Sequence, residues 1–283
     1  MNRTLQEYKS SIKPVWCPGC GDYGVLKSLQ KALAELDIAP EDVATISGIG
    51  CSGRFSHYMN TYSLHGTHGR AVPTAVGVKA ARPDLTVLCV GGDGDGLGIG
   101  GGHVPHAARK NVDITYILID NRIYGLTKGQ SSPTTPLERK TKTSPYGVYE
   151  EPLNAVAMLL AYDASFIARV SSLQMKEMVE VLKKGITHKG FSVIYVMSPC
   201  VTFPILPYNA LRDLISPLPE DHDTQDKIQA LRIAYDTDKI YTGVIYQKEK
   251  KTLSENLDSL VDHAVSVEGN KKISVRQLLE KYV

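Results

Sequence analysis

Residues 85–130 read LTVLCVGGDGDGLGIGGGHVPHAARKNVDITYILIDNRIYGLTKGQ, and this stretch decides the fold. It opens with an apolar run, 85–90, that is typical of a buried strand. A glycine-rich acidic loop follows, then a helical segment to about Lys110 and a second apolar run, 114–119. A strand, a helix and a second parallel strand form one right-handed crossover unit, so both strands end at the same edge of a sheet.

Two oxygen-bearing side chains follow these two strands. Asp93 lies in the glycine loop, and Asn121 follows the second strand, so we expect them to lie side by side. Such oxygens suit Mg²⁺, which usually keeps some of its coordination positions for water or for substrate phosphates. Glycines let the backbone approach a diphosphate closely, and the N-terminus of the following helix adds N–H donors. The sequence therefore predicts a magnesium–diphosphate site at this edge.

The spacing of Gly92-Asp93-Gly94 and Asn121 resembles the motif of thiamine diphosphate enzymes. The resemblance implies that Asp93 and Asn121 bind magnesium against the diphosphate. It also implies a third ligand, a backbone carbonyl two residues after the asparagine, which falls on Ile123. The usual motif ends in Asn-Asn, whereas this chain has Asp120-Asn121, so only the second position carries over.

A nicotinamide cofactor is the alternative at this loop. Residues 96–101 fit the pattern G-x-G-x-x-G, and Asp120 ends the next strand where a dinucleotide-binding fold places its ribose-binding acid. Electrostatics favours thiamine diphosphate, because Asp93 and Asp95 lie where the phosphates would bind and bare carboxylates would repel them. A bridging cation reverses that repulsion.

Composition limits the classes of function. A chain of 283 residues holds one large α/β domain or two small ones. Its 32 basic and 30 acidic residues give a net charge of +2, so no nucleic-acid partner is implied. The first residues lack a signal peptide and no apolar run reaches the length of a membrane span, so we expect a cytoplasmic protein without a membrane partner. Five cysteines then indicate metal or redox chemistry rather than a disulfide framework.

Strand and helix patterns alternate along most of the chain. Strands are expected at 43–47, 85–90, 114–119, 166–170 and 191–197, and helices after Asp22 (a plausible N-cap) and at 73–81, 153–162 and 173–184. This alternation predicts a doubly wound, mostly parallel α/β sheet over residues 1–206. The polar connection 131–151 is long enough to be functional or mobile. Residues 207–283 are expected to form an irregular extension with one strand, 240–246, packed on this chain or on a partner subunit.

Four of the five cysteines occur in loops beside glycine or proline: Cys17, Cys20, Cys51 and Cys200. Cys51 and Cys200 follow predicted strands, so they should lie near the same sheet edge as Asp93. Cys89 lies inside an apolar strand and is interpreted as a small core residue. Four loop thiolates suit an iron–sulfur cluster or a structural zinc.

The motifs together resemble the β subunit of 2-oxoacid:ferredoxin oxidoreductases over about residues 15–206. They are WCPGCGDYGVL, GIGCSGR, THGRA, GGDGDGLGIGGGH, DNRIYGLTKGQSSPT and SPC. The resemblance implies a thiamine diphosphate-binding fold, with one [4Fe-4S] cluster bound by the four loop cysteines next to thiamine diphosphate. Zinc remains the alternative, because tetrahedral thiolate sites accept either metal. The implied cofactor contacts are Ile49, Gly50, Cys51, Ser52, His68, Gly94, Asp95, Gly125 and Leu126.

Three residues are candidates for catalytic contacts. Arg54 and Lys128 could offer charge to a substrate carboxylate or to coenzyme A, although a solvated surface cation is an equal alternative for each. His68 could hydrogen-bond the diphosphate or the reacting carbonyl, and the resemblance favours a cofactor contact.

The resemblance implies coenzyme A-dependent oxidative decarboxylation of a 2-oxoacid, with electrons passed through the cluster to ferredoxin. Pyruvate and 2-oxoglutarate both remain open as substrates. The alternatives are a non-oxidative thiamine decarboxylase or carboligase, a nicotinamide dehydrogenase and a non-catalytic zinc-bearing scaffold subunit.

One part of a thiamine site is not found in the sequence. Thiamine enzymes need a carboxylate, usually glutamate, on a pyrimidine-binding domain, and this chain has one Gly-Asp-Gly…Asn signature and no second doubly wound pattern. We therefore expect a heterodimer with a larger α subunit that supplies the glutamate. The loop after Gln130, expected to be exposed and mobile, and the C-terminal extension are candidate contact surfaces.

Overall fold

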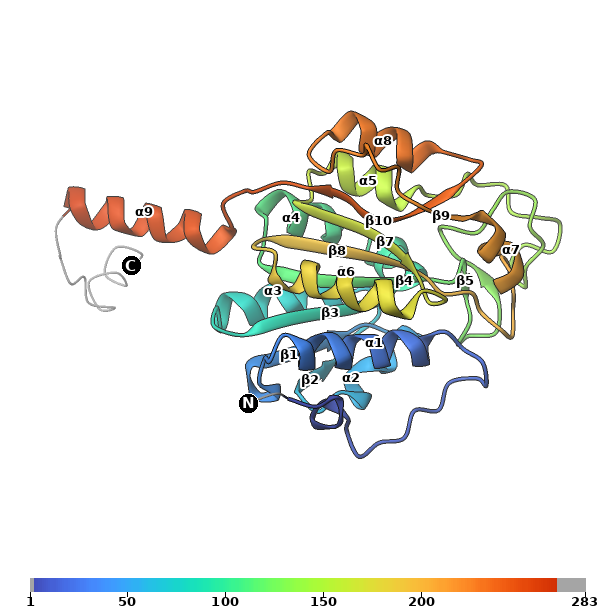
Figure 1. Cartoon of the computed structure of the whole chain (residues 1–283), viewed down its shortest axis with the longest axis horizontal. Coiled ribbons are helices and arrows are strands. Elements are labelled where there is room, and N and C mark those ends of the chain that lie inside the picture. The colour runs from blue at the N-terminus through green and yellow to red at the C-terminus, as the bar shows by residue number, and fades with distance from the viewer. Residues whose placement is uncertain (1–2, 269–283) are drawn as a thin grey trace, which may run out of the picture.

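The computed structural model describes residues 3–268, and an eight-stranded sheet forms its centre, with helices on both faces (Figure 1). The order of the strands across the sheet is β2-β1-β3-β4-β8-β7-β10-β9. The strands are β1 Val43–Ser47, β2 Tyr62–His65, β3 Thr86–Gly92, β4 Ile114–Asp120, β7 Phe166–Ser171, β8 Phe191–Met197, β9 Ile215–Pro217 and β10 Ile240–Gln247. Neighbours from β2 to β7 are parallel, and β10 runs antiparallel to β7. The predicted mostly parallel α/β sheet is confirmed.

The central strand β4 has the sequence ITYILID and is buried at every position, as expected for a strand covered on both faces. Its alternate residues enter two separate cores. Ile117 and Ile119 pack toward helices α1 (Asp22–Glu35) and α6 (Met175–Thr187). Tyr116 and Leu118 face the other core. That core is formed with α3 (Ala71–Ala81), α4 (His103–Lys110), α5 (Ala155–Ala161) and α8 (Lys227–Tyr235).

The remaining elements are short, except for the 16-residue helix α9. They are 3₁₀ helices at Leu5–Tyr8, Pro40–Asp42 and Ser52–Arg54, a wide helical turn at Gly94–Ile99, helices α2 Phe55–Tyr58, α7 Tyr208–Leu214 and α9 Leu253–Glu268, and the strand pair β5 Ile123–Tyr124 and β6 Gln130–Ser131. No helix in the part of the chain that the structure describes is long and apolar enough to cross a membrane.

The sequence expectation for Asp22 was wrong. Helix α1 begins at Asp22 itself, with Gly21 as its N-cap and no side-chain cap hydrogen bond. The backbone needs glycine at position 21, because an added Cβ would lie 2.4 Å from Oγ of Ser172. The carboxylate of Asp22 is instead buried and accepts a hydrogen bond of 3.2 Å from Ser198 Oγ.

The segment after residue 206 is more regular than expected. Strand β10 confirms the predicted 240–246 strand and joins the main sheet beside β7, while β9 pairs with β10 at the sheet edge. Helix α9 projects away from the sheet (Figure 1). Residues 269–283 of the predicted extension lie outside the described residues.

Candidate functional site

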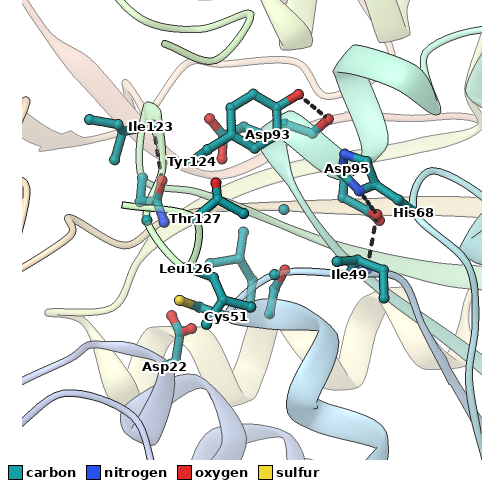
Figure 2. A pocket seen from close by; sticks show the side chains of 17 residues that line it. Asp22, Ile49, Cys51, His68, Asp93, Asp95, Ile123, Tyr124, Leu126 and Thr127 are labelled. Atoms are coloured by element: carbon teal, nitrogen blue, oxygen red, sulfur yellow. Dashed lines mark hydrogen bonds and ion pairs between the residues drawn. The ribbon is translucent and has the colours of Figure 1, made fainter. Parts of the chain in front are cut away.

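A cavity of about 200 Å³ opens at the carboxyl ends of β3 and β4, where the glycine loop and the loop after β1 meet (Figure 2). The two strands pair in parallel up to Gly92 and Ile119, so the residues that follow them enter the same space. The cavity brings together all nine predicted cofactor contacts and the three predicted magnesium ligands: Ile49, Gly50, Cys51, Ser52, His68, Asp93, Gly94, Asp95, Asn121, Ile123, Gly125 and Leu126.

Two buried carboxylates lie close together beneath this cavity. The hydroxyl of Thr134 lies 3.0 Å from Oδ2 of Asp93 and 2.8 Å from Oδ1 of Asp120. One hydroxyl proton cannot satisfy both carboxylates, although Asp120 also accepts a bond from the hydroxyl of Tyr195. Burial and the negative charge of Asp120 raise the pKa of Asp93 well above its ordinary value. Excess negative charge at a cavity wall fits a divalent cation, which would compensate it.

The turn after β4 is shaped by its own side chains. The backbone N–H of Arg122 donates to Asp120 Oδ1 at 2.7 Å, and that of Ile123 donates to Asn121 Oδ1 at 3.0 Å. Such bonds between a side chain and the backbone two residues on are typical of Asp and Asn in turns. They place Asn121 and Ile123 on the same cavity wall as Asp93.

Asp95 also lines the cavity, and its carboxylate joins two neighbouring loops, 48–50 and 66–70, by hydrogen bonds. Its Oδ1 accepts hydrogen bonds from the backbone N–H groups of Ile49 at 2.9 Å and Gly69 at 2.8 Å, and lies 2.8 Å from Nδ1 of His68 (Figure 2). Because a carboxylate accepts, Nδ1 of His68 carries a proton, and Nε2 is the ring nitrogen left for a ligand. Asp95 therefore positions His68 as well as the two loops that form one side of the cavity.

Replacing Asp95 with alanine is expected to lower the free energy of unfolding by about 2–4 kcal/mol, because three donors, one buried and two half-buried, would lose their acceptor. Chemical denaturation followed by circular dichroism measures this change. Asp84→Ala is the matched control, since Asp84 is exposed and pairs on the surface with Arg82. Equal stability of the Asp95→Ala variant and the wild type would contradict the role assigned to Asp95.

The aromatic ring of Tyr124 closes one side of the cavity and requires glycine at position 94. An added Cβ at Gly94 would lie 2.2 Å from the ring, and the Tyr124 hydroxyl donates to the carbonyl of Gly94 at 2.9 Å. Gly50 needs glycine for another reason, because its φ of +104° lies in a region that other residues rarely adopt.

A second cavity, of about 140 Å³, adjoins the first and is lined by the four predicted cluster cysteines, Cys17, Cys20, Cys51 and Cys200. All four thiols are free. Burial, followed by the charge of Asp22, raises the pKa of Cys20 strongly and that of Cys51 to about 12. Such thiols become thiolates only when a positively charged group binds them. Within the described residues, no three acidic, histidine or cysteine side chains lie close enough together to hold a single metal ion. The four thiols instead surround a shared space.

The two cavities share a wall. Asp22, Cys51, Asn121, Gly125 and Leu126 line both of them. Burial raises the pKa of Asp22 to about 6. The core assignment of Cys89 agrees with its full burial in β3.

The three predicted catalytic residues lie in two different cavities. His68 lies in the first cavity, whereas Arg54 and Lys128 line the cysteine cavity. Five residues that were not among the predicted site residues also line the first cavity: Asp22, Gly92, Ile119, Tyr124 and Thr127. Tyr124 and Thr127 belong to the DNRIYGLTKGQSSPT motif, so their position in that motif could have predicted that they lie in the site. Thr134 was missed because a polar loop gives no pattern that predicts a long-range contact.

The start of the connection 131–151 is also buried, contrary to its expected exposure. Ser132, Thr134 and Thr135 are all buried. Thr134 donates toward the carboxylates of Asp93 and Asp120, and Thr135 donates to the carbonyl of Arg122. The later part of the connection is exposed, as Tyr146 and Tyr149 show.

Comparison with known proteins assigns this fold and site to a class. A family described as "Thiamine pyrophosphate enzyme, C-terminal TPP binding domain" matches residues 48–196, and the chain is therefore a thiamine diphosphate-binding protein. A second family, described as the C-terminal part of the pyruvate ferredoxin oxidoreductase beta chain, matches residues 200–262.

Individual relatives narrow the class. Subunit β of 2-oxoacid:ferredoxin oxidoreductase 2 from Aeropyrum pernix is 36% identical over 92% of this chain and 89% of its own length. The 2-oxoglutarate synthase subunit KorB of Methanocaldococcus jannaschii is 41% identical over 88% of this chain and 93% of its own. The solved 2-oxoglutarate:ferredoxin oxidoreductase from Magnetococcus marinus, with 2-oxoglutarate, coenzyme A and succinyl-CoA bound, is 42% identical. Its TM-score is 0.93, and the match covers 99% of this chain and 96% of that one.

The chain belongs to the β subunits of the 2-oxoacid:ferredoxin oxidoreductases. It is thus one subunit of a multi-subunit, thiamine-dependent oxidoreductase. The nicotinamide alternative is not supported by these relatives.

Proposed function

We propose that this subunit holds Mg²⁺, the diphosphate end of thiamine diphosphate and one [4Fe-4S] cluster, and that it oxidises a 2-oxoacid together with a larger α subunit, coenzyme A and ferredoxin. The observation that carries the proposal is the shared wall between the two cavities, one with paired carboxylates and one with four free thiols. We also propose a cytoplasmic location, as expected from the sequence.

The described side chains fit these groups. Asp93, the side-chain oxygen of Asn121 and the carbonyl of Ile123 would hold the magnesium ion, and the excess charge of Asp93 and Asp120 supports this assignment. Cys17, Cys20, Cys51 and Cys200 would hold the cluster. When bound, thiamine diphosphate supplies the carbanion for decarboxylation, and the cluster accepts single electrons.

The residues of the chain then have separable tasks. Asp95 fixes the ring of His68, which offers Nε2 to the cofactor or to the reacting carbonyl. Tyr124 and Leu126 line the cavity, where their apolar surfaces would reduce the access of water to a bound cofactor. Arg54 and Lys128 lie at the neighbouring cavity, where either would attract a substrate carboxylate. We propose 2-oxoglutarate as the substrate to test first, because the related structure that contains it covers almost the whole chain.

The α subunit would complete the cofactor-binding site. Ligand pockets for a whole cofactor usually measure about 300–1,000 Å³, whereas this cavity measures about 200 Å³. This supports a site shared with the α subunit, which would supply the pyrimidine-binding domain and its glutamate.

The complex of this chain with its α subunit is expected to reduce methyl viologen when given coenzyme A and 2-oxoglutarate or pyruvate. The chain alone is expected to show no turnover, because half of the cofactor site would be missing. Anaerobic spectrophotometry with each 2-oxoacid measures both. A complex that decarboxylates without reducing the viologen would favour the non-oxidative alternative. Robust oxidation by the isolated chain would contradict the shared site.

A further inference from the structure

Trp16 is the only tryptophan of the chain, and it lines the cysteine cavity. It directly precedes Cys17 and is only 6% exposed. Its indole N–H donates a hydrogen bond of 2.8 Å to the carbonyl of Cys51, which lies 35 positions further along the chain. We call residues 17–20 the N-terminal cysteine loop and residues 49–52 the cofactor loop. A single side chain therefore ties these two loops together.

The cofactor loop contributes to both cavities and includes a position with open surroundings. All four of its residues line the first cavity, and Cys51 also lines the second. Gly50 has a φ of +104°, and an added Cβ there would have no atom within 4 Å. A glycine backbone of this kind has much conformational freedom to lose. Asp95 anchors the N–H of Ile49 on one side of Gly50, and the bond from Trp16 anchors Cys51 on the other.

The indole of Trp16 is itself held by aromatic side chains from the two helices that follow these loops. It meets the ring of Tyr23 in α1 edge-on, with 5.2 Å between the ring centroids. In α2 it meets Tyr58 edge-on at 4.9 Å and Phe55 at 5.2 Å. The hydroxyl of Tyr23 donates to the carbonyl of Trp16 at 2.9 Å, and the hydroxyl of Tyr58 accepts from the N–H of Val15 at 3.2 Å. These contacts fix the direction in which the indole N–H points.

We propose that Trp16 is a positioning residue that orders the cofactor loop before the cluster is bound. The proposal rests on the proposed function, in which Cys51 binds the cluster and its neighbours bind the cofactor. A bound cluster would join Cys51 to Cys17 and Cys20 and so impose the same constraint as the hydrogen bond. Two constraints on one loop are not additive, so each matters most when the other is missing. A loop that is already ordered binds the cofactor at a lower entropic cost.

The test uses the complete αβ complex with Trp16→Phe, compared with the wild type in cluster-loaded and cluster-free form. Phenylalanine keeps an aromatic ring for packing but removes the N–H donor. In the cluster-free form, the Kd for magnesium thiamine diphosphate is expected to rise about 5-fold, the size of one typical hydrogen bond. In the cluster-loaded form the Kd should stay unchanged, because the cluster then orders the loop. Calorimetry on all four samples measures these values without any turnover.

The cluster gives a second readout. By reciprocity, a variant whose cofactor affinity depends more on the cluster also binds the cluster less tightly, so iron release to a chelator should be faster in Trp16→Phe. Tyr58→Phe keeps its ring beside Trp16 but removes the acceptor for Val15, and should give both changes at smaller size. The matched control is Tyr8→Phe. Its buried hydroxyl donates to the carbonyl of Leu33, away from both cavities, so its loss should leave cofactor and cluster binding unchanged.

Three results would overturn the proposal: equal cofactor affinity of variant and wild type without the cluster, an equal loss of affinity with and without the cluster, or the same changes in Tyr8→Phe. The last two results would make Trp16 a residue of general stability only. If Trp16→Phe does not fold, Tyr58→Phe decides by the same criteria. Failure of the proposed function is separate, because the wild-type complex would then bind no iron–sulfur cluster or no thiamine diphosphate.

Discussion

Replacing Asp93 with asparagine is expected to weaken binding of magnesium thiamine diphosphate by at least 100-fold, about 2.7 kcal/mol, while raising the melting temperature of the cofactor-free chain. The two effects have one cause. Asparagine keeps a hydrogen-bond acceptor for Thr134 but removes a negative charge that is buried near Asp120. That charge opposes folding when no cation is bound and attracts the cation when one is present.

The pH dependence gives a further check on Asp93. Its pKa is raised in the folded chain, so the unfolded chain loses this proton first as pH rises past about 3.9. The free energy of unfolding of the cofactor-free wild type should therefore fall as pH rises above that value, and less so in the variant. Calorimetry gives the affinity and thermal denaturation gives the stability. Asp84→Asn, at an exposed position, is the control, and unchanged cofactor affinity in Asp93→Asn would rule out the magnesium assignment.

Replacing Cys200 with serine is expected to abolish or degrade the cluster and, with it, viologen reduction by the complex. Anaerobically purified wild type should contain about four iron and four sulfide per chain and be brown. Cys200 is one of four free thiols around the second cavity, and the other three alone would leave one iron without a protein ligand.

Iron and sulfide analysis with the visible spectrum measures this loss. Cys89→Ala is the matched control, since Cys89 is fully buried in β3 and should only affect stability. Stoichiometric zinc without iron in the wild type would favour the zinc alternative and defeat the redox mechanism.

The sheet could be predicted because its central strands are apolar along their whole length. Strand β4 is covered on both faces, and that burial leaves a continuous apolar run that is visible in the sequence. The edge strand β2 was missed for the opposite reason: Tyr62–His65 is exposed at every position and contains no such run. The short elements of the C-terminal segment, such as the three residues of β9, give too little sequence for a pattern.

The site was predictable where a residue follows a strand. Asp93, Asn121, Cys51 and Cys200 could be placed from strand ends alone, because parallel strands share one edge. Contacts made by irregular loops were not predictable, and Thr134 is the clearest case. Its position between two carboxylates depends on the path of a connection that has no periodic pattern.

That same connection carries Arg139, Lys140 and Lys142 a few residues after Thr134. One end of it therefore contacts the carboxylate that would receive the cation, and the other end lines an open cavity of about 740 Å³ on the far side of the β5–β6 pair. A cation bound by Asp93 would offset the repulsion between Asp93 and Asp120, so binding at the cavity would also stabilise the position of the segment that begins at Thr134.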